Sequence, residues 1–239
     1  MIRAMRRAFS PDRPEMMDAP GIAPDALREQ LRRLEQINRW FGGAAAVRAA
    51  AERLGLLRGT RPRVVADLAT GSADHPRRLA AWAAKAGVPL AIVAVDFHAE
   101  TLRLAREATP ASAPVFFVRA DATRLPFKDG ACDAAFCTLA LHHFSEDDAV
   151  AILREARRVG RAAAVIDLVR GRLAYAATWL LTQVWMTDPC TRHDGRLSVR
   201  RAFTGSELRG LAGRAGWRGV LWDKLPWFRQ MISFRETPE

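Results

Sequence analysis

The chain has few lysines, few cysteines and no long hydrophobic run. Only three of its 37 basic residues are lysines, so the net charge of +11 is carried by arginine. The arginines are spread through every expected helix and do not gather in one block, a pattern compatible with affinity for nucleic acid or acidic lipid, although an arginine-rich genomic composition is the simpler explanation. The three cysteines lack CxxC spacing, which argues against a disulfide framework or zinc site and favours a reducing compartment.

Signals for secretion or membrane insertion are also missing. The first ten residues are basic but contain no apolar core of a signal peptide. The apolar run from Leu173 to Met186 is shorter than the roughly 20 residues that a membrane span needs, and Thr178 and Gln183 interrupt it. We therefore expect a cytoplasmic protein with no membrane span. Met16 and Met17 are alternative start positions.

With 239 residues, 49% of them hydrophobic, the chain is long enough to bury one sizeable core. Short apolar runs alternate with helical patterns, which predicts a Rossmann-like α/β fold with a mostly parallel seven-stranded sheet between helices. The last two strands are joined by Pro226-Trp227, a spacing typical of a hairpin, so the last strand should be antiparallel. The expected strands are 64–68, 90–95, 115–118, 133–138, 162–166, 219–225 and 228–235.

Two segments lie outside this alternation. The pattern of residues 1–60 predicts a loose basic arm over 1–20 followed by a helical cap. We expect residues 61–239 to form the main domain. Within that domain, the stretch 171–203 predicts an amphipathic helix followed by an irregular piece over Thr187–Gly195. Long insertions in compact domains are commonly functional, so we expect 171–203 to be a lid over the substrate.

Polar and small residues follow the first three expected strands. Thr70 to Ala73 carry no bulky side chain, so their backbone can approach a ligand closely, although ordinary βα loops share this feature. Asp96 ends the second strand, 25 residues after Gly71, where it can accept hydrogen bonds from ribose hydroxyls; the alternative is a cap for the next helix. Asp121 and the backbone of Ala122 follow the third strand and suit an adenine ring.

These features resemble the class I S-adenosylmethionine-dependent methyltransferases, in particular the small-molecule branch with an "LHHF"-like segment. The resemblance rests on Asp67–Ala73, Leu125–Gly130 and Leu141–Phe144, and covers residues 63–170 well and 204–235 in outline. It implies S-adenosylmethionine as cofactor, S-adenosylhomocysteine as product, and no metal. The implied cofactor-binding residues are Asp67, Ala69, Thr70, Gly71, Ser72, Asp96, Phe97, Asp121, Ala122, Cys137, Thr138 and Leu139.

The glycine loop departs from the family pattern, because alanines replace its first and third glycines at positions 69 and 73. Alanine disfavours positive φ, so we expect ordinary backbone angles at both positions. This departure leaves open a cofactor-binding protein without catalysis. It also counts against the alternative of an NAD(P)-dependent oxidoreductase, which needs all three glycines for its pyrophosphate.

Histidines supply the candidates for a catalytic base. A hydroxyl or acidic carbon acceptor must lose a proton during methyl transfer, and imidazole suits that task near neutral pH. His142 and His143 follow the fourth strand beside the expected methyl position, and His193 lies on the insertion with Asp194 beside it. A packing role for each of the three is the alternative.

The insertion also suggests the acceptor. Its tryptophans and aliphatic residues favour a small apolar or aromatic molecule, such as a polyketide, a quinone or another secondary metabolite, methylated at oxygen or carbon. An RNA or other nucleic-acid methyltransferase is the alternative that the charge favours, but no motif for that chemistry follows the fourth strand. The oligomeric state stays open, with a homodimer as one option. The expected substrate-binding residues are Trp40, Tyr175, Trp179 and Arg192.

Overall fold

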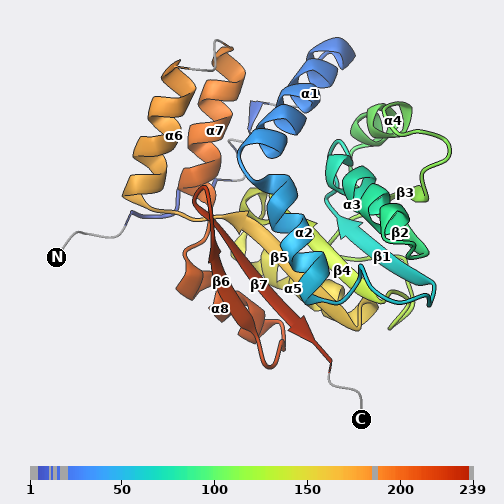
Figure 1. The fold of residues 1–239 in the computed structure, drawn as a ribbon. Helices are drawn as coiled ribbons and strands as arrows, with labels where there is room; N and C mark the ends of the chain where they lie inside the picture. The colour runs from blue at the N-terminus through green and yellow to red at the C-terminus, as the bar shows by residue number, and fades with distance from the viewer. Residues whose placement is uncertain (1–4, 11, 13–14, 17–20, 185–187, 237–239) are drawn as a thin grey trace.

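The computed structural model describes residues 5–10, 12, 15–16, 21–184 and 188–236, and its centre is one seven-stranded sheet (Figure 1). The strand order is β3-β2-β1-β4-β5-β7-β6, with every neighbouring pair parallel except those that involve β7. This confirms the predicted Rossmann-like fold and its antiparallel last strand. The strands are β1 (Arg63–Leu68), β2 (Leu90–Asp96), β3 (Val115–Arg119), β4 (Ala134–Thr138), β5 (Ala162–Leu168), β6 (Leu221–Leu225) and β7 (Arg229–Arg235).

Helices cover both faces of the sheet. One face packs against α2, α3 and α4, and the other packs against α5 and α8. Ser145 caps α5 by accepting a hydrogen bond from the backbone of Asp148, and a capping box of Thr204 and Glu207 opens α8, as their sequences predict. The helices are α1 (Pro24–Trp40), α2 (Gly43–Arg53), α3 (Asp74–Lys85), α4 (Ala99–Glu107), α5 (Glu146–Val159), α6 (Arg172–Val184), α7 (Pro189–Arg201) and α8 (Gly205–Arg214), with a short 3₁₀ helix, η2 (Leu141–His143).

The two central strands β4 and β5 are apolar up to Thr138 and Asp167 near their carboxyl ends, because helices cover both of their faces. Along β5, Ala163 and Val165 point to the core under α5 and α8, whereas Ala164 and Ile166 point to the core under α2 and α3. The carboxyl ends of β1 and β4, which are neighbours, meet at the point where the strand order reverses. In open α/β sheets, ligands bind at this switch point.

The N-terminal segment is not loose where the structure describes it. The Arg7 guanidinium donates hydrogen bonds to the backbone oxygens of Arg201 and Phe144, both at 2.6 Å. The backbone of Ala8 also donates to the oxygen of Arg200 at 3.0 Å. The prediction of a loose arm is therefore wrong for residues 5–10, because an arginine side chain anchors them between α7 and the end of β4.

Helices α6 and α7 lie side by side at one end of the molecule, next to α1 (Figure 1). The sequence predicted the first of these helices, but it predicted an irregular piece where α7 begins. Asp188 starts α7 by accepting a hydrogen bond from the backbone of Thr191 at 2.8 Å, and Pro189 occupies the first turn. Thr187, within the predicted irregular piece, lies outside the described residues. No helix in the described ranges has the length and apolarity needed to cross a bilayer.

Candidate active site

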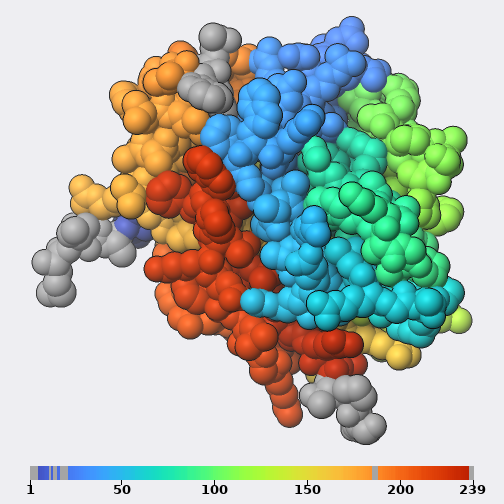
Figure 2. Space-filling model, in the orientation of Figure 1, coloured from blue at the N-terminus to red at the C-terminus, as the bar shows by residue number. Residues whose placement is uncertain are grey.

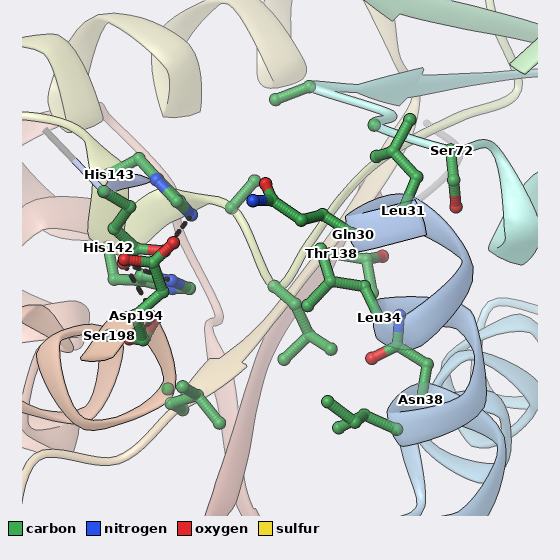
Figure 3. A pocket seen from close by; sticks show the side chains of 18 of the residues that line it. Gln30, Leu31, Leu34, Asn38, Ser72, Thr138, His142, His143, Asp194 and Ser198 are labelled. Carbon is green, nitrogen blue, oxygen red and sulfur yellow. Dashed lines mark hydrogen bonds and ion pairs between the residues drawn. The ribbon is translucent and has the colours of Figure 1, made fainter. Parts of the chain in front are cut away.

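A cavity of about 1370 Å³ opens at the switch point of the sheet. Its floor is formed by the loops after β1, β2, β3 and β4, and its walls by α1, α6 and α7. On the face shown in Figure 2, α1 lies between the α6–α7 pair and the helices that cover the sheet. An ion pair of 3.0 Å between Arg33 and Asp188 joins α1 to α7. The close-up in Figure 3 shows polar side chains of η2 and α7 facing those of α1 across the cavity.

The loop after β1 makes a tight turn of three left-handed residues. Ala69, Gly71 and Ala73 have φ angles of 53°, 55° and 56°. The expectation of ordinary backbone angles at the two alanines is therefore wrong, because the turn needs left-handed backbone there and a single methyl group is small enough to be forced into it. A Cβ on Gly71 would meet no atom within 4 Å, so space is left beside this turn. Ala69, Thr70, Gly71 and Ser72 all line the cavity.

Three carboxylates gather around this loop. Asp96 ends β2, lines the cavity and accepts a hydrogen bond from the backbone N–H of Gly71 at 2.9 Å. Asp67 at the end of β1 accepts one from the Thr70 hydroxyl at 2.6 Å. The pKa of Asp67 is raised to about 7, chiefly by burial; the Thr70 hydroxyl opposes the shift, and the nearby carboxylates of Asp74 and Asp96 contribute to it. The loop is thus a region of negative potential.

The other predicted cofactor residues divide between the cavity and the core. Phe97, Asp121, Ala122, Thr138 and Leu139 line the cavity. Asp67 and Cys137 are buried beneath it, and burial raises the pKa of the Cys137 thiol well above its ordinary value. Asp67 contacts the loop through the Thr70 hydroxyl, whereas the Cys137 thiol is an unreactive part of the core.

His142 and His143 project into the cavity from η2 (Figure 3). The Nδ1 atom of His142 lies 2.6 Å from a carboxylate oxygen of Asp167, the residue near the end of β5. That oxygen also accepts from the backbone of Leu168, so the proton between the two side chains belongs to Nδ1. The Nε2 atom is thereby left with its lone pair directed away from Asp167.

Glu15, from the N-terminal segment, completes this cluster. Its carboxylate lies 3.9 Å from Nε2 of His142 and 3.9 Å from Nε2 of His143. The Ser198 hydroxyl on α7 donates to it at 2.7 Å, and the Arg201 guanidinium lies 4.0 Å away. Glu15 is only 2% exposed, so this negative charge is buried against two imidazole rings at the polar end of the cavity.

Residues 66–166 match the family model described as a methyltransferase domain. They hold the loop after β1, the acids that follow β2 and β3, and the histidines after β4. The chain therefore carries a methyltransferase domain over these residues. No curated protein sequence matches it.

Solved methyltransferase structures share the fold of this methyltransferase. A SAM-dependent methyltransferase from Aquifex aeolicus has a TM-score of 0.62 and 16% identity, covering 86% of this chain and 96% of that one. Human N-acetylserotonin methyltransferase in complex with SAM has a TM-score of 0.64 and 14% identity, but the match covers 90% of this chain and only 57% of that one. The plantazolicin methyltransferase in complex with SAH has a TM-score of 0.67 and 11% identity, covering 90% and 92%.

The four expected substrate-binding residues of the methyltransferase lie outside the cavity lining. Trp40 is 60% exposed at the end of α1. Trp179 is 46% exposed and lies under the Arg196 guanidinium, whereas Arg192 donates to backbone oxygens of α6. Tyr175 does not reach the cavity either, because the face of α6 that lines it carries Ala177, Leu181 and Val184. His193 is also outside: its Nδ1 lies 3.0 Å from Asp194, and its side chain is largely exposed.

Sequence reasoning missed several polar residues of the methyltransferase cavity. Glu15 carries no local signal, because it belongs to a non-periodic segment far from η2 in the sequence. His75 and Arg229 are buried and line the cavity, and both ring nitrogens of His75 lack a hydrogen-bond partner within the described ranges. Asp167 was predicted only as a strand end. A signal did exist there, because acids that end parallel strands share the ligand edge of the sheet.

Proposed function

We propose that this enzyme transfers the methyl group of S-adenosylmethionine to a hydroxyl oxygen of a small, mainly apolar or aromatic molecule. One observation supports this above all: a single cavity joins the loop after β1 to the His142–Asp167 pair. The cofactor loop and a candidate base therefore share one space, as direct transfer from cofactor to acceptor requires.

The residues around the loop fit the cofactor. The open space beside Gly71 admits the methionine part, and Asp96 brings a carboxylate to the cavity that can accept hydrogen bonds from the ribose hydroxyls. Phe97 is 59% exposed at the cavity and can stack on the adenine, with Asp121 beside it. The buried Thr138 hydroxyl lacks a hydrogen-bond partner in the described part of the chain, as expected where a ligand normally supplies one. The cofactor supplies an electrophilic methyl group on a positively charged sulfur, which suits the negative loop.

His142 acts as the general base in this proposal. Its Nε2 takes the proton of the acceptor hydroxyl, while Asp167 holds the ring and stabilises the imidazolium that forms. The acceptor oxygen then uses its lone pair to form a C–O bond to the methyl carbon. The C–S bond breaks with its electron pair moving to sulfur, so a neutral thioether leaves. His143 and Glu15 border the same space and complete its polar end.

The opposite wall indicates the chemistry of the acceptor. Leucine and isoleucine side chains of α1 and aliphatic side chains of α6 line the space away from η2, which is therefore mainly apolar, with Gln30 and Asn38 of α1 as polar exceptions. Figure 3 shows Leu31 and Leu34 on the wall opposite His142 and His143. An acceptor with an apolar body and one hydroxyl matches this division. The apolar wall consists of Ile22, Leu27, Leu31, Leu34, Ile37, Ala177, Leu180, Leu181 and Val184.

A nucleic-acid acceptor fits less well. The only cysteine that lines the cavity, among the described residues, is Cys190, and burial raises the pKa of its thiol to about 12. A thiol held so far from ionisation is a poor nucleophile for cytosine. The small-molecule acceptor is therefore the one we propose.

Calorimetric titration tests the cofactor first. The purified protein should bind S-adenosylmethionine and S-adenosylhomocysteine but not NAD, and Asp96→Ala should weaken both complexes by at least about 10-fold, since it removes two hydrogen bonds to ribose. Asp129→Ala, an exposed acid outside the cavity, is the matched control and should bind as the parent does. Binding of NAD alone would reject a methyltransferase function.

A panel of phenolic and quinol acceptors then tests the base. His142→Gln should lower kcat by about 10²-fold or more for any accepted phenol while binding of the cofactor stays unchanged, because only proton removal is lost. His193→Gln, which changes a histidine outside the cavity, should leave kcat unchanged. Equal effects of the two substitutions would rule out His142 as the base.

A further inference from the structure

We propose that Glu15, His142 and His143 form a binding site for a divalent transition-metal ion, of which Zn²⁺ is the physiological candidate. One ligand atom from each residue lies within 4.8 Å of the other two, and the described part of the chain contains no other such group. Two imidazole nitrogens and one carboxylate oxygen are a common donor set for zinc with an open position. The catalytic role given to the ion below rests on the proposed function, but its binding does not.

The spacing of the three groups favours an ion over direct hydrogen bonds. Each histidine Nε2 stands 3.9 Å from the Glu15 carboxylate, which is too long for a hydrogen bond. Ligand atoms of a tetrahedral zinc site are about 3.4 Å apart, given metal–ligand bonds of about 2.1 Å. The ligand atoms would therefore have to approach one another by about 0.5 to 1.4 Å to surround an ion.

The surroundings hold the ligands as a metal site requires. Asp167 accepts from Nδ1 of His142, which presents Nε2 with its lone pair to the cavity. Ligating histidines nearly always have such a carboxylate or carbonyl partner on the other nitrogen. The Ser198 hydroxyl fixes Glu15 in the same way, with Arg201 beside the same oxygen, Oε1. The second oxygen, Oε2, is the one that faces His143.

Burial adds a reason for an ion at this place. Glu15 is 2% exposed and His142 is 3% exposed, so neither can be solvated by bulk water. Ser198 and Arg201 already partner one oxygen of the buried carboxylate, and a divalent cation would add a further partner for it between the two imidazole rings. The cavity leaves room for a further ligand on the side facing the acceptor.

The ion would change how the acceptor is activated. An acceptor hydroxyl bound as the fourth ligand would have a lowered pKa and would release its proton to solvent on binding. Its oxygen then forms the C–O bond and the C–S electron pair moves to sulfur, as without the ion. The ion thus replaces Nε2 of His142, which becomes a ligand, in the removal of the proton.

Metal titration without cofactor or acceptor tests the site. Untagged, chelator-treated protein should bind one Zn²⁺ per chain by calorimetry and should give the visible d–d absorption of Co²⁺ bound to nitrogen. Asp167→Asn should weaken binding by about 10- to 100-fold, and Glu15→Gln, His142→Gln and His143→Gln by at least as much. His193→Gln is the matched control and should bind Co²⁺ as the parent does.

Two results would overturn the site. One is the absence of Zn²⁺ and Co²⁺ binding by a protein that still binds S-adenosylmethionine, which shows that the chain is folded. The other is binding that Cys190→Ser abolishes and Glu15→Gln leaves intact, because the ion would then be on the thiol. S-adenosylmethionine binding is also measured for each variant to exclude misfolding. Because the ion is titrated without cofactor or acceptor, a failure of the metal site can be distinguished from a failure of the methyltransferase proposal.

Discussion

Ala69 and Ala73 hold a backbone conformation that glycine adopts at no cost. Their φ angles of 53° and 56° bring each Cβ close to the following carbonyl, at a cost of about 1–2 kcal/mol per residue. Ala69 is only partly buried, so removal of its methyl group leaves no large cavity. We expect Ala69→Gly to raise the free energy of unfolding by about 0.5–1 kcal/mol in urea denaturation, after the greater freedom of glycine in the unfolded chain is subtracted.

Ala84→Gly is the matched control for this prediction. Ala84 is exposed in α3 and has helical backbone, so the same change should lower the free energy of unfolding by about 1 kcal/mol. If both substitutions destabilised the protein to the same extent, the left-handed strain assigned to the loop would be contradicted.

The buried Asp67 makes stability depend on pH. Its pKa rises from 3.8 to about 7 on folding, so the folded protein binds a proton that the unfolded chain has released. The resulting destabilisation is absent below about pH 4, grows as pH rises, and is complete above about pH 7, where it amounts to roughly 4 kcal/mol. Asp67→Asn keeps an acceptor for the Thr70 hydroxyl but removes the charge.

We therefore expect Asp67→Asn to raise the free energy of unfolding by a few kcal/mol at about pH 8, and by much less at about pH 4.5. Urea denaturation at the two pH values, without cofactor, measures the difference. An equal gain in the free energy of unfolding at both pH values would mean that the stabilising effect of the substitution comes from packing and not from the loss of an ionisable group.

At the scale of the elements, local patterns predict the sheet but not every helix. The strands were predictable because apolar runs such as Val64–Leu68 end at polar residues, and this pattern is independent of distant contacts. Helix α7 was missed because its sequence is mainly polar and contains Gly195, which weakens the helical pattern. Its start was nevertheless encoded by Asp188-Pro189, a cap followed by a proline in the first turn.

The same contrast applies to the candidate site: features set by local sequence patterns were predictable, and features set by the packing of distant elements were not. The gathering of the loops after β1, β2 and β3 at one edge of the sheet was predictable, because parallel strands bring their carboxyl ends to the same edge. The choice among aromatic residues for the substrate was not. Trp179 and Leu181 are two residues apart on α6 and therefore point in different directions, so only the docking of the helix decides that Leu181 reaches the cavity. The place of Glu15 in the cavity likewise depends on how the N-terminal segment packs against η2 and α7.

At the scale of the whole molecule, the N-terminal segment returns to η2, which is far from it in the sequence. Arg7 anchors the N-terminal segment on the backbone oxygen of Phe144, directly after the histidines, and the Arg170 guanidinium donates to the oxygen of Met5 at 2.8 Å. Glu15 then enters the cavity beside His142. Glu15 is therefore part of the candidate active site, although it belongs to neither the sheet nor the cofactor loop.

A variant that begins at Met17 tests this organisation. It lacks Glu15 and the Arg7 anchor but keeps every residue that we expect to hold the cofactor, so its affinity for S-adenosylmethionine should be unchanged by calorimetry. Its turnover of an accepted phenol should fall by on the order of 10-fold or more, because the polar end of the cavity loses its carboxylate and the support of η2.

The variant Glu15→Gln in the full chain separates these two causes. If it loses as much turnover as the shortened chain, the effect is due to the carboxylate. If it loses less, the remainder is due to the Arg7 anchor. Full turnover by the shortened chain would show that the arm only covers a complete active site.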